Sequence, residues 1–546
     1  MGQPGRSTLR RSTLRRSTLA AMAVGALLTG CATVQPTATA PAGGRAGQVV
    51  AFSGAEAPGA VHATPPDGRD TRVLPSSTTP TPPWHASGRR PNILLITADD
   101  ASILDLPWMP HVRKLIGSHG VTFADAIAPT PICVPARASL LTGQYAHNHG
   151  AVTISGPRGG FPAFRDTDTV PVALQRNGYA TLFTGKYLNG YGDHDPRYVP
   201  PGWTDWRGLA IGTYDFFNQT VNVNGRLVPS HRYSTFTVRD QADQLIRQHR
   251  GHKPWYLWVN YVAPHVGAPV QRGDPMRIDR GTNAAYQTTV PAPSDFNRYA
   301  GIHLPRRPDM FERDTRDKPR ISVARHRLDA RQKAAMRIVF ERRIEAVRGV
   351  DRAVASQIRV LRRTHQLANT VVMFTSDNGY VTGEHNYDGK LWHYNEILRI
   401  PALMRGPGVP RHQVVRTAIT NPDIAATILA LARTTSLRPL DGVDMMPWLN
   451  APTQLRVIPI EGWAVHNGRQ QRYTGVRVGK WTYIRYHRGA QEMYDRSWDP
   501  YELHSLQRRP AWVDQLHQLQ RLTRKYHACR ANTCPKAFYP VSPSRS

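Results

Sequence analysis

Residues 133–143 read Cys-Val-Pro-Ala-Arg-Ala-Ser-Leu-Leu-Thr-Gly, and this stretch carries more structural information than any other part of the chain. Pro135 suits the first turn of a helix, and Arg137 follows in the same turn. Cys133 is therefore expected at a helix N-terminus, where free backbone N–H groups and the positive end of the helix dipole favour an anion. An ordinary buried cysteine at a helix start gives the same local pattern, so the flanking sequence has to decide between the two interpretations.

Short apolar segments lie on both sides of this stretch and predict buried strands. They comprise residues 92–97, 179–184, 255–262 and 370–375. Nearly continuous apolar runs of this length are typical of strands buried on both faces of a largely parallel sheet. Residues 329–367 instead place apolar side chains three and four positions apart, which predicts a helix with one buried face. The alternation of strands and helices predicts an α/β fold, with a large and mostly parallel sheet sandwiched by helices.

The sequence changes character beyond residue 441. Residues 473–478 and 481–486 are strand-like and flank Gly479-Lys480, which predicts a hairpin, and residues 491–495 are a candidate third strand. A helical segment at residues 512–527 follows. We expect this part to form a smaller C-terminal antiparallel sheet with a helix, packed on the main domain.

The first 31 residues resemble an export signal. Five arginines precede an apolar segment at residues 20–28, which is shorter than the roughly 20 residues that a membrane-spanning helix needs. Residues 28–31 (Leu-Thr-Gly-Cys) are similar to a bacterial lipobox, so the predicted role of Cys31 is to carry a lipid that anchors the exported protein to a membrane. The paired arginines are a loose match to twin-arginine export, and a start codon placed too early explains the Arg-Ser-Thr-Leu repeat equally well. Residues 32–90, rich in Ala, Thr, Pro, Gly and Ser, predict a disordered tether.

The chain contains four cysteines. Cys529 and Cys534 lie close together near the C-terminus of a protein expected outside the cytoplasm, which predicts a disulfide. With Cys31 assigned to the lipid, Cys133 is left as an unpaired thiol. Such a thiol is a liability in an oxidising compartment unless it is buried or chemically used, and the sequence around Cys133 favours use.

The formal net charge of the chain is +31, and removal of residues 1–31 subtracts five arginines and no acidic residue. A surface this basic attracts polyanions, so nucleic acid, anionic membrane and sulfated glycan are all admissible partners. An arginine-rich composition spread over a solvated surface is an equally good explanation. The arginines are dispersed and no segment resembles a nucleic-acid-binding module, so we expect no nucleic-acid partner.

Polar residues follow each of the four predicted strands of the main domain. In chain order they are Asp99 and Asp100, Lys186, His265, and Asp377 and Asn378. Ligands bind at the carboxyl ends of strands in open α/β sheets, so these side chains are expected to meet there. Three carboxylates and an amide form a hard oxygen ligand set that suits Ca²⁺ or Mg²⁺ and argues against zinc. Taken singly, each acidic group is more simply a cap or a turn residue.

The segment 90–534 resembles the formylglycine-dependent, type I sulfatases of the alkaline phosphatase superfamily. Its sequence motifs are most similar to those of N-acetylglucosamine-6-sulfatases and heparan sulfatases. Besides the cysteine stretch, the likeness rests on residues 145–149 (YAHNH), 185–189 (GKYLN), 374–380 (FTSDNGY), 389–390 (GK), 493–495 (MYD) and 499–503 (DPYEL). The resemblance implies a large mixed, mostly parallel sheet and hydrolysis of a sulfate ester of a sugar or an aryl alcohol.

The resemblance further implies that a formylglycine-generating enzyme oxidises Cys133 to formylglycine. Hydrated formylglycine has two hydroxyls: one attacks sulfur and expels the alcohol, and deprotonation of the second releases sulfate. Arg137 is then expected to neutralise and orient the modified residue, while Lys186 and Lys390 hold sulfate oxygens. His265 is expected near the leaving oxygen, as proton donor or as its orienting partner.

The family also implies a divalent cation, Ca²⁺ or alternatively Mg²⁺. Its expected ligands are Asp99, Asp100, modified Cys133, Asp377 and Asn378. One position departs from the family pattern, because many sulfatases carry a histidine where this chain has Leu188. His147 is a speculative substitute, although a structural role is the better expectation for it. His385 and His393 lie near Lys390 in the sequence and are further candidates for substrate contact.

The expected organisation is as follows: export signal with lipobox, 1–31; disordered tether, 32–90; sulfatase catalytic domain, 91–440; C-terminal α+β subdomain, 441–535; tail, 536–546. Residues 200–230 and 266–320 are expected to be loops that determine specificity. Two other functions are retained: a phosphonate monoester or phosphodiester hydrolase of the same superfamily, and a lipid-anchored glycan-binding protein that has lost catalysis.

Overall fold

The computed structural model describes residues 89–251, 253–275, 286–321, 327–451, 453–465, 468–537 and 539–540. The predicted export signal, the lipid attachment at Cys31 and nearly all of the predicted tether lie outside these described residues. Within the described part of the chain, no helix combines the length and the apolarity that a membrane crossing requires.

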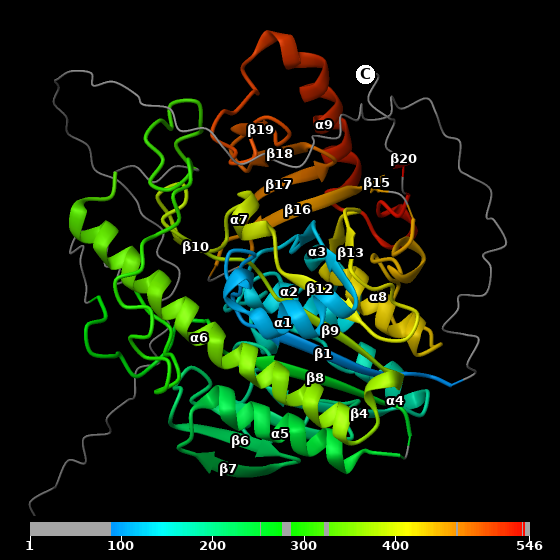
Figure 1. Cartoon of the computed structure of the whole chain (residues 1–546). Coiled ribbons are helices and arrows are strands. Elements are labelled where there is room, and N and C mark those ends of the chain that lie inside the picture. The colour runs from blue at the N-terminus through cyan, green and yellow to red at the C-terminus, as the bar shows by residue number, and fades with distance from the viewer. Residues whose placement is uncertain are drawn as a thin grey trace, which may run out of the picture.

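A ten-stranded mixed sheet forms the centre of the molecule (Figure 1). In spatial order its strands are β13 (Gln413–Val415), β2 (Val121–Phe123), β12 (Ala402–Arg405), β9 (Thr370–Ser376), β1 (Asn92–Ala98), β8 (Trp255–Tyr261), β4 (Ala180–Gly185), β5 (Asp205–Ile211), β6 (Gln219–Val223) and β7 (Arg226–Ser230). Neighbouring strands from β9 to β5 run parallel, whereas β12 and β6 pair antiparallel with their neighbours. The predicted large, mixed and mostly parallel sheet is confirmed.

The four apolar segments predicted as buried strands are β1, β4, β8 and β9, and each is buried along its whole length. Their side chains alternate between the two faces of the sheet. Ile93 and Leu95 of β1 belong to one hydrophobic cluster, whereas Leu94 and Ile96 belong to the other. Both faces of the sheet are therefore covered, as the sandwich interpretation requires.

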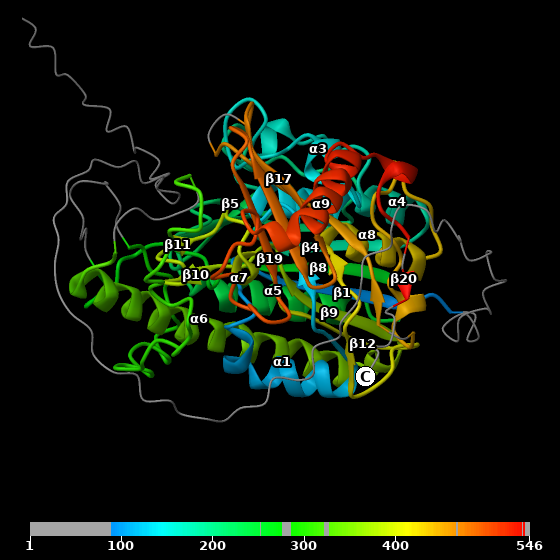
Figure 2. The same ribbon diagram turned by 90° about the horizontal axis from the view of Figure 1, so that it is seen from above.

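Helices cover the two faces (Figure 2). The helices α1 (Pro110–Leu115), α5 (Ser234–Gln248) and α6 (Ala330–Arg363) pack on one face, and α2 (Cys133–Thr142), α4 (Val170–Arg176) and α8 (Asn421–Leu431) pack on the other. The long predicted helix is α6. It begins after Asp329, whose carboxylate accepts from the Gln332 backbone N–H at 2.8 Å while the Gln332 side chain accepts from the Asp329 N–H at 2.9 Å. This capping box fixes the start of the helix.

A smaller antiparallel sheet lies above the main sheet in Figure 1. Its strands are β16 (Val457–Trp463), β17 (Gln471–Val478), β18 (Trp481–Tyr486) and β19 (Gln491–Asp495), and α9 (Val513–Tyr526) packs on it. The predicted hairpin and third strand are confirmed, and Cys529 and Cys534 form the predicted disulfide. The sequence analysis missed β16, because Pro459 and Gly462 interrupt its strand pattern. Pro459 is tolerated since β16 is an edge strand of this sheet, and Gly462 lies where the pairing register with β17 shifts.

Residues 200–230 do not form the loop expected from the sequence, because most of them belong to β5, β6 and β7. Asn224 and Gly225 make a tight hairpin turn with positive φ between β6 and β7. Pro229 lies in β7, the edge strand of the main sheet, where a missing N–H is tolerated. In contrast, the described residues between 266 and 320 form loops without a regular helix or strand, as expected.

The remaining regular elements are short: β3 (Ala126–Ile127), β14 (Ile419–Thr420), β10 (Val381–Thr382), β11 (Asp388–Gly389), β15 (Gln454–Leu455), β20 (Tyr539–Pro540), α3 (Ala146–His149) and α7 (Asn395–Leu398). The β10–β11 hairpin matters most for the site, because Lys390 follows it directly. The small sheet supports the segment after Lys390: Tyr473 of β17 donates to the Leu391 carbonyl at 2.9 Å, and Tyr486 of β18 lies 2.6 Å from His393 Nε2.

Candidate active site

The candidate site lies at the carboxyl ends of four parallel strands. Asp99 and Asp100 follow β1, His265 lies shortly after β8, Lys186 follows β4, and Asp377 follows β9. Because these strands are neighbours and run in one direction, their ends lie at one edge of the sheet. The Asp100 N–H donates to Asp377 Oδ1 at 3.0 Å, which joins residues 277 positions apart in the chain. The convergence expected from the sequence is therefore observed.

Cys133 is the first residue of α2, after Ile132 in an extended conformation. Its side chain is buried, and Lys390 Nζ donates to Cys133 Sγ at 2.8 Å. Asp100 Oδ1 lies 4.0 Å from the same sulfur. Burial raises the pKa of the Cys133 thiol to about 12 and outweighs the opposing effect of Lys186 and Lys390. The unmodified thiol is therefore protonated at neutral pH, which makes it a weak nucleophile.

Arg137 holds several parts of the site together from one turn further along α2. Its Nε donates to Asp377 Oδ2 at 2.8 Å, and its Nη1 donates to the Lys186 carbonyl at 3.0 Å and to Asn260 Oδ1 at 3.2 Å. Its Nη2 lies 3.3 Å from Asp99 Oδ1. The guanidinium is fully buried, so its planar donors fix the ends of four strands relative to the helix that carries Cys133.

Two buried lysines balance the carboxylates of the site. Lys186 Nζ pairs with Asp99, and Lys390 Nζ pairs with Asp100. Burial disfavours the charged form of each lysine, but the paired carboxylate outweighs it and holds each lysine pKa above its usual range. Burial also acts on Asp99, where Lys186 and Arg137 reverse its effect and lower the carboxyl pKa. Both lysines are therefore cationic and close to the Cys133 side chain.

The oxygen atoms of the site fit a hard divalent cation. Carboxylate oxygens of Asp99, Asp100 and Asp377 lie within 4.8 Å of one another. Asn378 Oδ1 is buried without a hydrogen-bond partner, and so is Asp99 Oδ1. A buried oxygen without a hydrogen-bond donor is costly, and a cation would satisfy Asn378 Oδ1 and add to the ion pair that Asp99 Oδ1 makes with Arg137. Burial and the neighbouring Asp99 raise the pKa of Asp377, and added positive charge would oppose this shift.

His265 lies at the rim of these groups. Its Nδ1 is 2.7 Å from the Val266 carbonyl, which assigns the proton of the neutral ring to Nδ1. Its Nε2 then faces Asp100, at 3.7 Å from Oδ2. Burial lowers the pKa of His265 despite the nearby Asp100 and Asp99. The free nitrogen therefore points toward the carboxylates, where the sequence analysis expected this histidine.

The structure adds two side chains that the sequence analysis missed. Asn260, in β8, accepts from Arg137 and from Thr97. Tyr214, between β5 and β6, stacks on His265 with ring centroids 4.5 Å apart, and Lys186 Nζ lies 4.9 Å from the centre of its ring. The apolar strand run concealed Asn260. No local sequence signal indicated that Tyr214, in the connection between β5 and β6, reaches the site.

Three histidines considered in the sequence analysis are engaged elsewhere. His147 Nδ1 lies 3.1 Å from Glu461 Oε2 and its Nε2 lies 2.7 Å from the Cys529 carbonyl. Both ring nitrogens are thus occupied, which favours the structural role. His385 and His393 are buried, with ring nitrogens 2.7 Å from a Glu312 carboxylate oxygen and 2.6 Å from the Tyr486 hydroxyl oxygen respectively. These contacts disfavour substrate binding by either one.

Family comparisons agree with this site. A family model described as Sulfatase matches residues 91–434. A second, described as N-sulphoglucosamine sulphohydrolase, C-terminal, matches residues 383–528. The chain belongs to the sulfatase family. The resemblance to type I sulfatases of the alkaline phosphatase superfamily is thereby confirmed.

Relatives of this chain carry sulfatase names. It is 30% identical over 368 residues to an arylsulfatase of Volvox carteri, covering 64% of this chain and 56% of the relative. It is 29% identical over 388 residues to N-acetylglucosamine-6-sulfatase of Homo sapiens, covering 68% and 66% respectively. An extracellular sulfatase homologue of Drosophila melanogaster is 29% identical over 382 residues, covering 67% and 32%. These matches span between about a third and two thirds of the relatives' own length.

Solved structures share the fold. One, an enzyme in complex with its substrate D-glucosamine-2-N,6-O-disulfate, has a TM-score of 0.65 and 19% identity, covering 80% of this chain and 97% of that one. A phosphonate monoester hydrolase from Silicibacter pomeroyi has a TM-score of 0.57 and 20% identity, covering 79% and 94%. Both enzyme classes therefore occur on this fold, so the fold alone does not choose between them.

Proposed function

We propose that this chain is a sulfatase that hydrolyses sulfate esters of sugars after Cys133 has been converted to formylglycine. One observation carries the proposal: a buried cysteine at a helix N-terminus lies against Lys390 and beside three carboxylates that suit a cation. The sulfatase names of the relatives support the reaction class. The relatives named for N-acetylglucosamine-6-sulfatase, and the solved complex with a glucosamine disulfate, support an amino sugar sulfate as substrate.

In this proposal formylglycine supplies a hydrated aldehyde whose one hydroxyl attacks sulfur and whose other hydroxyl permits sulfate release. Lys390 lies where it can donate to the nucleophilic position and to a sulfate oxygen, because its Nζ already contacts the Cys133 side chain. Lys186, which pairs with Asp99, adds a second cationic side chain to the site. Cationic side chains that are already in place in a buried site stabilise the negative charge that redistributes in the transition state, because they need not move during the reaction.

Asp99, Asp100, Asp377 and Asn378 would hold the cation, with the modified Cys133 as a further ligand. Ca²⁺ is the preferred ion and Mg²⁺ the alternative, because the ligands are oxygens from carboxylates and an amide. When bound, the ion supplies positive charge that attracts a sulfate oxygen and favours an ionised nucleophile. Arg137 keeps Asp377 and the backbone at Lys186 in place, so the ligands are oriented before the ion arrives.

His265 is the best-placed group for the leaving oxygen. Its Nδ1 is held by the Val266 carbonyl. Its Nε2 has no hydrogen-bond partner in that segment of the chain and faces the Asp100 carboxylate. A ring held in one tautomer can orient a leaving group or pass a proton to it. Stacking on Tyr214 fixes the plane of the ring.

The protein's cellular context is also part of the proposal. The lipobox at Cys31, the disulfide and the extracellular names of two relatives support export. Attachment of a lipid to Cys31 and maturation by a formylglycine-generating enzyme remain predictions. The domain limits at residues 91, 440 and 535 are likewise proposed, and residue 440 falls between α8 and β16.

A phosphonate monoester or phosphodiester hydrolase is the second candidate, because a protein with that activity shares the fold. Steady-state kinetics on matched aryl substrates separate the two. A sulfatase shows the higher kcat/KM with 4-nitrophenyl sulfate or with glucosamine-6-sulfate. A higher kcat/KM with the phenyl phosphonate or the diester would assign the chain to the second class.

A further inference from the structure

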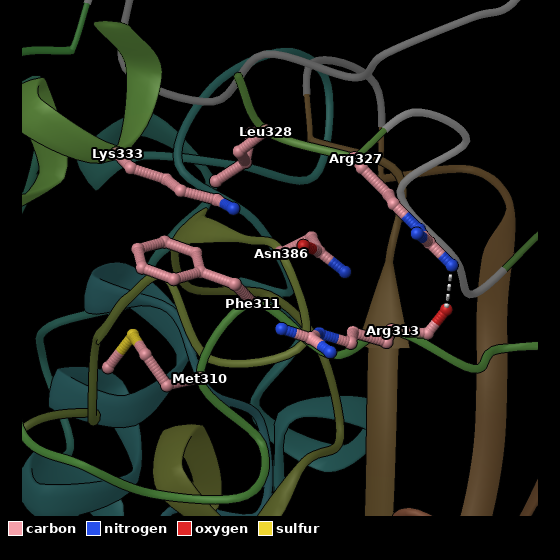
Figure 3. A pocket seen from close by; sticks show the side chains of 7 residues that line it. All are labelled: Met310, Phe311, Arg313, Arg327, Leu328, Lys333 and Asn386. Atoms are coloured by element: carbon pink, nitrogen blue, oxygen red, sulfur yellow. Dashed lines mark hydrogen bonds between the residues drawn. The ribbon is translucent and has the colours of Figure 1, made fainter. Parts of the chain in front are cut away.

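A pocket of about 350 Å³ lies beside the hairpin that leads to Lys390 (Figure 3). Met310, Phe311 and Leu328 form its apolar walls, and Asn386 from the β10–β11 turn lies at its centre. In Figures 1 and 2 the first turns of α6, which carry Lys333, and the strand β10 both lie to the left of the main sheet. None of the residues assigned above to catalysis or to the cation lines this pocket.

The pocket is cationic. Arg313, Arg327 and Lys333 line it, and no acidic residue does so among the described residues. The guanidinium of Arg313 has no hydrogen-bond or ion-pair partner within the described part of the chain. Figure 3 shows it pointing, with the Lys333 ammonium, toward the space around Asn386. Arg327 instead donates to the Arg313 carbonyl at 3.1 Å and braces that segment.

Neighbouring acidic residues are committed to other partners. Asp314 pairs with Arg316, and Asp329 caps the first turn of α6. The carboxylate of Glu312 pairs with buried Lys318 and lies beside His385. Among the described residues no carboxylate forms an ion pair with Arg313 or Lys333, so both cations are available to an anion from outside.

The pocket also has the features of a sugar-binding surface. The Phe311 ring lies beneath Lys333, whose Nζ is 5.2 Å from the ring centre, so an apolar face adjoins a cation. Asn386 is largely buried, and its Oδ1 has no hydrogen-bond donor. Its Nδ2 donates to the Glu312 carbonyl at 2.8 Å, which fixes the amide. Asn386 thus gives the pocket a fixed polar group beside its apolar walls, and ligand pockets typically combine apolar walls with a few placed polar groups.

The pocket is built on the same hairpin as the catalytic lysine. Phe311 donates its N–H to the Gly383 carbonyl at 2.9 Å, so the pocket wall is hydrogen-bonded to the turn. Gly383 has a φ of 123°, and a Cβ there would lie 2.7 Å from atoms of Met310 and Phe311, so only glycine allows this approach. Asn386 and Lys390 are four residues apart, and a chain of that length spans at most about 14 Å. The pocket therefore lies within the length of a short oligosaccharide from the catalytic lysine.

We propose that this pocket is a subsite that binds an anionic group on a sugar adjoining the one that is desulfated, so that the chain prefers multiply charged oligosaccharides. Arg313 and Lys333 bind the anionic group, and Phe311 packs against the sugar ring. That the bound oligosaccharide is also a substrate rests on the proposed function. The binding itself is measurable without turnover.

The test measures binding by calorimetry in the Cys133→Ala background, with a fully sulfated heparin tetrasaccharide and with glucosamine-6-sulfate as probes. The tetrasaccharide is expected to bind more tightly than the monosaccharide. Arg313→Ala and Lys333→Ala should each weaken tetrasaccharide binding by roughly tenfold, the size expected for loss of a charge-assisted contact. The charge reversal Arg313→Glu should weaken it further. Arg316→Ala is the matched control, because Arg316 is an exposed arginine of the same segment that already pairs with Asp314.

Unchanged tetrasaccharide affinity in Arg313→Ala, Lys333→Ala and Arg313→Glu would overturn the subsite, even if the wild-type protein hydrolyses sulfate esters. An equal loss in Arg316→Ala would also overturn it, because the effect would then be one of net charge. If binding depends on the pocket but the matured wild-type protein releases no sulfate from any ester, the proposed function falls and the pocket stands as a glycan-binding site.

Discussion

Lys390 Nζ lies 2.8 Å from Cys133 Sγ, although the two residues are 257 positions apart in the chain. The contact joins the first residue of α2 to the end of the β10–β11 hairpin, and the same lysine pairs with Asp100 beyond β1. The Lys390 ammonium thus links Cys133, the expected nucleophile, to Asp100, an expected ligand of the divalent ion. This relationship connects the helix, the sheet and the hairpin in a single site.

The first prediction concerns Lys390. In the matured protein, Lys390→Ala should lower kcat for sulfate ester hydrolysis by about 10²–10³-fold, because a preorganised donor at the reacting group is lost. Lys114→Ala is the control, since Lys114 is an exposed lysine on α1. Stopped assays with 4-nitrophenyl sulfate measure the effect. A kcat for Lys390→Ala equal to that of Lys114→Ala would remove Lys390 from the mechanism.

The second prediction concerns the cation. Removal of divalent ions with a chelator should abolish turnover and lower Tm, and Ca²⁺ should restore both, because an ion that binds only the folded state stabilises it. Asn378→Ala should shift the Ca²⁺ concentration needed for half-maximal stabilisation upward by about 10-fold or more. Calorimetric scans across a Ca²⁺ series provide the measurement. Asn218→Ala, at an exposed asparagine, should respond as wild type does; a Ca²⁺ response retained in full by Asn378→Ala would exclude this ligand.

The third prediction concerns Cys133. Substitution by alanine should lower turnover by about 10⁴-fold or more, because the residue that forms the covalent bond is gone. Binding of a sulfated sugar should remain measurable, since Lys186, Lys390 and the carboxylates are untouched. Paired kinetic and calorimetric measurements check both parts. Substantial turnover in Cys133→Ala would show that another group attacks the ester.

The fourth prediction uses the buried pair of His147 and Glu461. Burial alone would lower the pKa of His147, but Glu461 reverses this and raises it to about 9. A raised pKa in the folded state stabilises the protein fully below the unfolded value of about 6.5, and this contribution is lost as pH rises from there through about 9. A tenfold difference in proton affinity between the folded and unfolded states corresponds to about 1.4 kcal/mol, so the pair contributes a few kcal/mol at most.

His147→Asn should therefore lower Tm clearly at pH 6 and much less at pH 9.5. The control is His194→Asn, because His194 is an exposed histidine. Thermal unfolding of the three proteins across this pH range measures the difference. A Tm deficit of His147→Asn that is constant with pH would mean that packing, and not the charge of the pair, supplies the stabilisation.

The strands and the long helix of the main domain could be predicted from the sequence because their signals are local. The apolar runs of β1, β4, β8 and β9 are continuous, and Asp329 with Gln332 forms a recognisable capping box. β5 to β7 were missed because their patterns are mixed and Pro229 suggests a break. Such edge strands depend on pairing partners that the local sequence does not reveal.

The site could be predicted only in part for the same reason. Residues directly after buried parallel strands, such as Asp99 and Asp377, must meet at one sheet edge, so their convergence follows from topology. Lys390 lies after a hairpin, and only the family motif indicated it. Tyr214 and Asn260 contact the site through loop conformation and side-chain packing, which no spacing rule predicts.

The most direct test of the central claim is mass spectrometry of the tryptic peptide 115–137 from protein produced together with a formylglycine-generating enzyme and shown to release sulfate. The account predicts that Cys133 has lost its sulfur and carries an aldehyde, and that the converted fraction rises in proportion to sulfate release across preparations. A peptide that retains the intact thiol in fully active protein would contradict it.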